Sequence, residues 1–268
     1  MDAWLILLPA FVMTALMVVT HTYLGLHILA RGIIFADLAL AQMAALGASV
    51  AFLIGEESHS VTAQIFAFAA TFIAAGAFSQ LRRIKDTTTR EVTIGVVYVV
   101  STALSIVILS RSSQGMEELK AIFNGNILWV SWEEIAVISL VYAVVALFHS
   151  IFSKPFFDLS FSDKSKEPSY LWEFFFFLSF AIVITMAVSV AGVLLVFAFL
   201  IIPAFSASLI HKAYNIRLII GWLLGIVGSI AGLFVAFVFD LPVGATVVSL
   251  LGVLPVIAAG IRVLRKIS

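Results

Sequence analysis

Asp37 and Gln42 are the two polar side chains of residues 32–47, GIIFADLALAQMAALG, a stretch in which every other residue is apolar or glycine. A charged side chain at the middle of a bilayer costs roughly 2.5 to 3.5 kcal/mol, so it normally faces a bundle interior or a wet cavity. We therefore predict that Asp37 lies on the path of a transported cation; the alternative is that it anchors this segment near Arg31. Gln42 is a second candidate, although a buried glutamine also hydrogen-bonds to neighbouring helices.

Three further residues could bind a metal ion. His21 and His27 fall in the first apolar run, and imidazole suits zinc and iron; the alternative is that each is a hydrogen-bonded packing residue. Glu91 falls at the start of another apolar run, where an acid also favours the dipole of a helix N-terminus. The chain has no cysteine, so thiolate ligands and disulfides are excluded. The other histidines are expected in solvent: His59, His149 and His211.

The composition requires an integral membrane protein, because 63% of the 268 residues are hydrophobic and 11% are charged. A net charge of zero gives no reason to expect a nucleic-acid partner. Runs of roughly 20 apolar residues can cross the hydrocarbon core as helices. They predict an all-α, polytopic protein with about nine spans, or eight if residues 189–192 form a break within the membrane: 4–29, 33–54, 61–81, 92–109, 135–152, 171–190, 192–210, 216–239 and 243–264.

Basic residues give the orientation of these spans, because they concentrate in loops on the cytoplasmic side. With the N-terminus outside, 13 of the 15 basic residues fall on inner segments, and only Arg111 and Lys120 fall outside. We therefore predict an N-out, C-in topology. The inner residues are Arg31, Arg82, Arg83, Lys85, Arg90, Lys154, Lys164, Lys166, Lys212, Arg217, Arg262, Arg265 and Lys266.

Two loops and one span have patterns of their own. The outer segment 110–134 predicts a short amphipathic helix. The inner segment 153–169 carries Phe156, Phe157, Leu159 and Phe161 among charges, which indicates a docking surface; contact of these side chains with lipid headgroups is the alternative. Pro203 is expected to kink its span, and Asp240 to occupy a turn. Four glycines on one face of residues 216–239 predict close helix packing: Gly221, Gly225, Gly228 and Gly232.

Motifs for nucleotide binding and hydrolysis are missing from the sequence. No G-x-x-x-x-G-K-[ST] is present to hold ATP phosphates. No H-E-x-x-H or G-x-S-x-G is present either, so an enzyme has little support. If nucleotide energises transport, a separate subunit must bind it.

Five ordered segments resemble the membrane permease subunits of ABC transporters that import zinc, manganese or iron. They are LGLHILARGIIFADLALAQMAALG, REVTIGVVY, LKAIFNGNILWVSWEEI, VAGVLLVFAFLIIPAFSAS and DLPVGATVV. Each segment is a weak match alone, but five in order are strong. The matching positions are Gly25, Arg31, Asp37 and Gly47; Glu91 and Gly95; Phe123, Gly125 and Glu133; Gly192, Pro203 and Ala204; and Asp240, Pro242 and Gly244.

This resemblance implies a single permease domain over residues 1–268, working as a homodimer in the prokaryotic plasma (inner) membrane. It implies two partners, a cytoplasmic ABC ATPase and an extracytoplasmic solute-binding protein, and no permanently bound cofactor. The segment Asp158, Leu159, Ser160 and Phe161 resembles the family's ATPase-coupling helix. A divalent metal ion is the expected substrate, with zinc favoured.

The sequence departs from the family where a histidine commonly follows the acid by one helical turn, because Ala41 occupies that position. On a regular helix Gln42 lies about 140 degrees around the axis from Asp37, so the two could not share a ligand. A one-residue π-bulge would bring them together, and we predict one here. The lost histidine leaves a permease for a metal chelate, such as a siderophore or a cobalamin-like cofactor, as the alternative. A nucleotide-independent transporter or a membrane enzyme is a more distant one.

Overall fold

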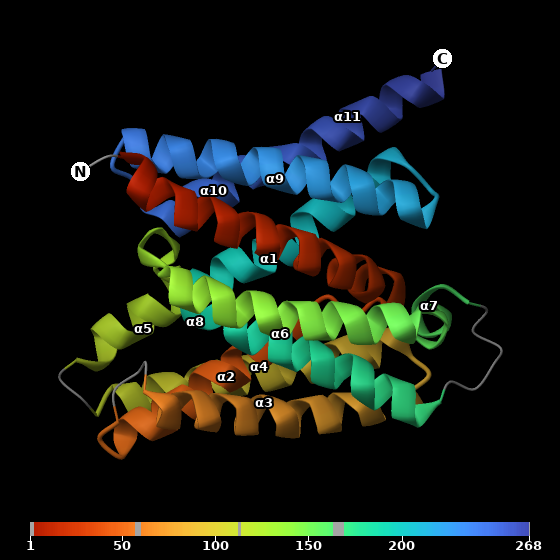
Figure 1. The fold of residues 1–268 in the computed structure, drawn as a ribbon. Helices are drawn as coiled ribbons and strands as arrows, with labels where there is room; N and C mark the ends of the chain where they lie inside the picture. The colour runs from red at the N-terminus through yellow and green to blue at the C-terminus, as the bar shows by residue number, and fades with distance from the viewer. Residues whose placement is uncertain (1–2, 57–59, 112–113, 163–168, 268) are drawn as a thin grey trace. The chain divides into compact units, whose positions relative to one another are not determined.

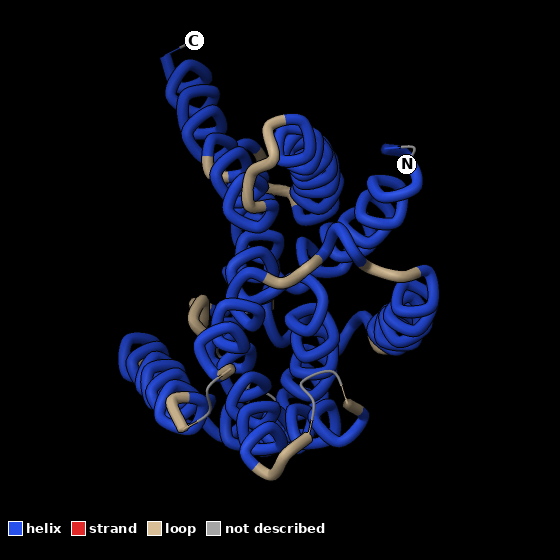
Figure 2. Tube along the Cα trace, turned by 90° about the vertical axis from the view of Figure 1, so that its left-hand side faces the viewer, coloured by secondary structure: helices blue, strands red, loops and turns tan. Residues whose placement is uncertain are grey.

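The computed structural model describes residues 3–56, 60–111, 114–162 and 169–267, and within these ranges the chain forms helices and short loops with no strand (Figure 2). A helix satisfies its own backbone hydrogen bonds, which lipid cannot do. Figure 1 labels the α-helices in chain order. The elements are α1 (Ala3–Arg31), α2 (Ala36–Leu53), α3 (Val61–Gln80), η1 (Leu81–Arg83), α4 (Thr87–Leu109), α5 (Gly115–Asn124), η2 (Ile127–Trp129), α6 (Trp132–Ile151), α7 (Ser153–Phe161), α8 (Tyr170–Ile210), α9 (Tyr214–Val238), α10 (Val243–Leu251) and α11 (Val253–Ile267).

The described residues contain eight segments that are long and apolar enough to cross a membrane. This is the lower of the two expected counts. Residues 170–210 form one helical segment that is broken at Gly192 but contains no intervening loop. The last candidate span joins α10 to most of α11 across Gly252. The all-α, polytopic fold class is therefore confirmed. The N-out, C-in orientation stays a prediction, and it requires an odd number of crossings.

Helix α8 is interrupted at Gly192, whose φ of 75° and ψ of 162° are not helical. A residue with a side chain rarely adopts this backbone conformation. The break is stabilised by the turn before η2, since the backbone N–H of Asn126 donates to the carbonyl of Val190 over 2.8 Å. Gly125, with φ of 62°, lies directly against Ala191 and Gly192. Pro203 lies inside the helix without breaking it, and the break lies 11 residues earlier, at Gly192.

The chain divides into two compact units, and each is described by itself. The first comprises residues 1–29, 124–140 and 190–268, and the second comprises residues 30–123 and 141–189. Helices α1, α5, α6 and α8 therefore each contribute to both units.

In the first unit, the glycines of α9 lie against two neighbouring elements. Gly221 and Gly225 approach Thr22 and Val18 of α1, together with Pro203 of α8. Gly228 and Gly232 approach Leu251 and Val247 of α10, which lies beside α9 (Figure 1). Because glycine has no side chain, these helices can approach closely, and the four glycines thereby position α9 among its neighbours.

In the second unit, α2 is the central helix and packs against α3 and α4. Of its span, 61% is buried within the chain, compared with 33% for α3 and 22% for α4. Small side chains allow this crowding, and Gly47 lies directly against the backbone of Phe66 and Ala67 on α3. A polar group on α2 is therefore surrounded by protein and not by lipid.

Both helices expected in the long loops are present, as α5 and α7. Helix α7 is only partly a free surface, because Phe156 is fully buried and Leu159 is 8% exposed. Phe156 stacks on the ring of His149, with 3.9 Å between the ring centroids. The expectation that all four apolar residues of this segment form a docking surface is wrong for these two. Phe157 and Asp158 are exposed. Lys164 and Lys166 lie outside the described residues.

Candidate functional site on α2

Asp37 lies in the first turn of α2, and its side chain is 1% exposed. Neither carboxylate oxygen has a hydrogen-bond partner among the described residues. The N-terminal end of a helix dipole favours a negative charge there. A buried charge without hydrogen bonds is nevertheless costly. A bound ligand could reduce that cost, because both carboxylate oxygens of Asp37 are available to it.

Arg31 does not neutralise Asp37, because its guanidinium forms an ion pair with Glu173 of α8. That ion pair is buried, with side-chain exposures of 5% for Arg31 and 3% for Glu173. The alternative in which Asp37 is an anchor beside Arg31 therefore has no ion pair to support it.

Gln42 is buried on α2 but does not join Asp37. Every residue from Ala36 to Leu53 is α-helical, so the predicted π-bulge is absent and that prediction is wrong. On this regular helix the two side chains point about 140 degrees apart. The Nε2 of Gln42 is buried without a hydrogen-bond partner among the described residues, so Gln42 is a separate polar position.

Glu91, on α4, holds the beginning of α2. Its Oε1 accepts a hydrogen bond of 2.9 Å from the backbone N–H of Phe35, the N-cap residue of α2. Its Oε2 is buried and has no hydrogen-bond partner in the described chain. Helix α4 itself begins at Thr87, and its N-cap residue Asp86 accepts hydrogen bonds from the hydroxyl and backbone N–H of Thr89. These bonds lower the pKa of the Asp86 carboxyl.

Replacing Glu91 with alanine should lower the stability of the chain by about 1 kcal/mol, the usual cost of losing a helix cap. Glu91→Gln keeps an oxygen that can accept from Phe35 and should keep both stability and uptake. Thermal unfolding in detergent and uptake into vesicles would test the pair. A glutamine variant that is stable but inactive in uptake would contradict this structural role and favour a role in metal binding.

His21 and His27 belong to the first unit. His21 is fully buried, and its Nδ1 lies 2.8 Å from the carbonyl oxygen of Met17, one turn earlier on α1. His27 is 1% exposed and lies between the rings of Tyr23 and Tyr214, with ring centroids 4.8 and 6.0 Å away. Within the described ranges, no three side chains among the histidines and acids come together to hold a metal ion.

His149 was expected in solvent, and that expectation is wrong. Its side chain is 3% exposed, and its Nε2 lies 2.8 Å from the hydroxyl of Ser179. The expectation failed because hydropathy shows only that His149 lies near the end of a span. It does not show that α7 and α8 cover this side of the span. His211 is partly exposed, and His59 lies outside the described residues.

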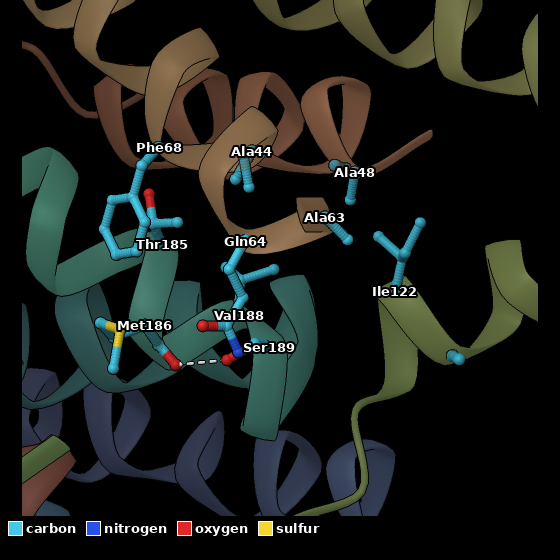
Figure 3. Close-up of a pocket in the computed structure, with 13 residues that line it drawn as sticks. Ala44, Ala48, Ala63, Gln64, Phe68, Ile122, Thr185, Met186, Val188 and Ser189 are labelled. Atoms are coloured by element: carbon cyan, nitrogen blue, oxygen red, sulfur yellow. Dashed lines mark hydrogen bonds between the residues drawn. The ribbon is translucent and has the colours of Figure 1, made fainter. Parts of the chain in front are cut away.

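A pocket of about 90 Å³ lies in the second unit, between α2, α3, α5 and α8 (Figure 3). Ala44 and Ala48 line it from α2, and they lie on the same helix face as Asp37, within about 20 degrees of it. At 1.5 Å per residue they are about 10 and 16 Å further along the axis. Two alanines on the Asp37 face of α2 therefore line this pocket, with larger side chains such as Phe68, Ile122 and Met186 on its other walls.

The polar side chains of this pocket were not among the predicted site residues. Gln64 comes from α3, and Thr185 and Ser189 come from α8. The Thr185 hydroxyl donates to the carbonyl of Ala181 over 2.7 Å. The Ser189 hydroxyl donates to the carbonyl of Met186 over 2.8 Å (Figure 3). A hydroxyl bonded to its own helix gives no sequence signal, because serine and threonine are common in apolar spans.

Comparisons with known proteins agree on one class. Residues 4–261 match the sequence model described as the ABC 3 transport family. The manganese transport system membrane protein MntC of Listeria monocytogenes is 28% identical over 229 residues, which are 84% of this chain and 79% of that protein. The manganese import system permease protein ScaB of Streptococcus gordonii is 26% identical over 58% of this chain and 57% of its own length.

A solved structure supports the fold. The chain is similar to one in the structure of PsaBC from Streptococcus pneumoniae in complex with Fab, with a TM-score of 0.76 and 22% identity. The similarity covers 98% of this chain and 95% of that one. Nearly the whole described arrangement of helices is thus shared with a known structure.

Proposed function

Because this chain belongs to the ABC 3 transport family, a family of multi-pass permeases of the bacterial plasma membrane, we propose that it is the permease subunit of an importer for Mn²⁺. The general class, a metal-transport permease, follows from the family and its relatives. The choice of ion, the partners and the residues on the path belong to the proposal.

Asp37 is the observation that carries this proposal. Its carboxylate is buried, lacks hydrogen-bond partners in the described chain, and lies on the same face of α2 as Ala44 and Ala48, which line the pocket. A passing divalent cation would offset the cost of that buried charge. One carboxylate holds an ion far more weakly than a closed four-ligand cage, which suits transient binding during transport.

Manganese is preferred to zinc on chemical grounds and by relationship. Carboxylate, carbonyl and water ligands suit Mn²⁺, whereas imidazole suits zinc. In the second unit, the buried carboxylate oxygens without a hydrogen-bond partner in the described chain belong to Asp37 and Glu91, and the candidate histidines His21 and His27 belong to the first unit. Relatives named as manganese transport proteins point the same way. The zinc preference of the sequence analysis is therefore not retained.

The remaining parts of the importer are separate chains. We infer a cytoplasmic ATPase, since this sequence has no phosphate-binding loop, an extracytoplasmic solute-binding protein, and a second copy of this permease. The exposed side of α7, around Asp158, is the proposed contact for the ATPase, with Leu159 fixing that helix to its own chain. Ser160 and Phe161 complete the segment.

A metal chelate is the less favoured substrate. Pockets for ligands of drug size occupy about 300 to 1,000 Å³. The pocket lined by Ala44 and Ala48 of α2 has about 90 Å³. This volume is below that range, which favours a small ion over a chelate.

The proposal is tested by reconstituting the chain in vesicles with its ATPase and solute-binding protein. We expect ATP-dependent accumulation of Mn²⁺, with competition by Zn²⁺ weaker than competition by unlabelled Mn²⁺. Vesicles without the permease chain are the control. Accumulation of an iron–siderophore complex but not of Mn²⁺ would favour the chelate alternative, and no accumulation of any metal would reject an importer.

A further inference from the structure

Glu173, in the first turn of α8, is a buried acid that joins two basic side chains. Its Oε1 forms an ion pair with Arg31, and its Oε2 accepts from Nη1 of Arg82 over 2.9 Å. The carboxylate is 3% exposed, and the side chain of Arg82 is 24% exposed. All three residues belong to the second unit.

Arg82 extends this network to α7. The same Nη1 also donates to the backbone carbonyl of Leu159 over 3.3 Å, near the end of α7. The stack of Phe156 on the ring of His149 also holds α7, and both rings are buried. Helix α7 is therefore fixed to its own chain by an aromatic stack and by a charged hydrogen bond.

Arg31 extends the network to the start of α2. It is the last residue of α1, and residues 32–35 form the turn that leads directly into α2. The guanidinium of Arg31 also lies 4.5 Å from the ring centroid of Phe176 on α8. Asp37 follows this turn by two residues, so the position of Arg31 bears on the position of the buried carboxylate.

Stability alone does not explain such a network. Burying charges costs about as much as their attraction returns, and apolar side chains of similar size often serve as well or better. What a buried, hydrogen-bonded set of charges does provide is one fixed geometry among the elements it joins.

We propose that Arg82 and Glu173 are positioning residues that couple movement of α7 to the turn before Asp37. This inference rests on the proposed function, in which an ATPase acts on α7 and a cation passes Asp37. Displacement of α7 moves Arg82 through the Leu159 carbonyl, and Glu173 passes the displacement to Arg31.

The test compares Arg82→Met with Arg83→Met in vesicles that contain the complete importer, with Mn²⁺ as the transported ion. Both variants remove one positive charge from the same short helix η1, but Arg83 is exposed and is not bonded to Glu173. Arg82→Met leaves Glu173 paired with Arg31. We expect about a tenfold loss of Mn²⁺ imported per ATP hydrolysed, within the five- to 150-fold range typical of coupling between sites, and no loss for Arg83→Met.

Several results would overturn the proposal. In the first, Arg82→Met imports as many ions per ATP as the wild type does. In the second, Arg82→Met lowers hydrolysis, uptake and thermal stability, while the number of ions imported per ATP stays the same. Arg82→Gln serves if the methionine variant does not fold, because its neutral amide has no ion pair with Glu173; an unchanged ratio in the glutamine variant would then reject the inference. Wild-type vesicles that hydrolyse ATP without importing metal would instead reject the proposed function, and this inference with it.

Discussion

Replacing Asp37 with asparagine should reduce Mn²⁺ uptake to the background of vesicles that lack the chain. The change removes one negative charge and keeps the size of the side chain. Because the carboxylate is buried without hydrogen bonds in the described chain, its neutralisation removes an unfavourable desolvation term. We therefore expect the unfolding temperature in detergent to stay the same or rise, and basal ATP hydrolysis to remain measurable.

Asp240→Asn is the matched control for this variant. Asp240 has a φ of 52° in the turn between α9 and α10, and asparagine tolerates that conformation. It should import Mn²⁺ as wild type does. Added Mn²⁺ should raise the unfolding temperature of the wild-type chain and of Asp240→Asn, but not of Asp37→Asn. Normal uptake by Asp37→Asn would remove Asp37 from the path.

Replacing Gly125 with alanine should prevent the first unit from forming its native junction. With φ of 62°, an L-residue at this position is strained by roughly 1 to 2 kcal/mol. The added methyl group would also overlap the backbone of Ala191 and Gly192, which cannot rotate away, and overpacking typically costs a further 1 to 3 kcal/mol. The expected total of about 2 to 5 kcal/mol is a large part of the stability of a typical protein.

The yield of monodisperse chain in detergent and its unfolding temperature measure this effect. Gly76→Ala is the control, because Gly76 lies within α3 and a methyl group there would meet no atom within 4 Å in the described chain. Alanine also favours a helix over glycine by roughly 0.5 to 1 kcal/mol. Equal yields of the two variants would show that the close approach at Gly125 does not govern folding.

Hydropathy predicted most of the fold because the requirement for about 20 apolar residues per span is strict. It could not decide whether residues 189–192 form a loop. In the structure there is no loop: Gly192 alone has a non-helical backbone, and the break is stabilised by a hydrogen bond from Asn126 to the carbonyl of Val190. The partner is more than 60 residues away in the sequence, so local patterns at Gly192 do not show it.

The candidate site was predicted unevenly for a related reason. Asp37 stood out because no charge is expected on a crowded helix, and the structure buries it. Glu173 was missed because it begins an apolar run, where an acid suits the helix dipole. Arg31 and Arg82 were counted only as indicators of orientation, although one buried acid brings them together. Such a three-residue contact depends on the packing of η1 against α8. The spacing of residues along the sequence does not reveal this packing.

The alanines that line the α2 pocket have a mechanical consequence. Alanine has no rotatable side-chain torsion that could swing a heavy atom into or out of the hollow, so Ala44 and Ala48 present a wall of fixed profile. On the α2 side, the profile of this hollow can then change only when the helix itself slides or tilts, whereas Phe68, Ile122 and Met186 on the other walls can change rotamer. Movement of the α2 wall should accordingly be a collective event on the microsecond-to-second scale, slower than the rotamer changes of the side chains that face it.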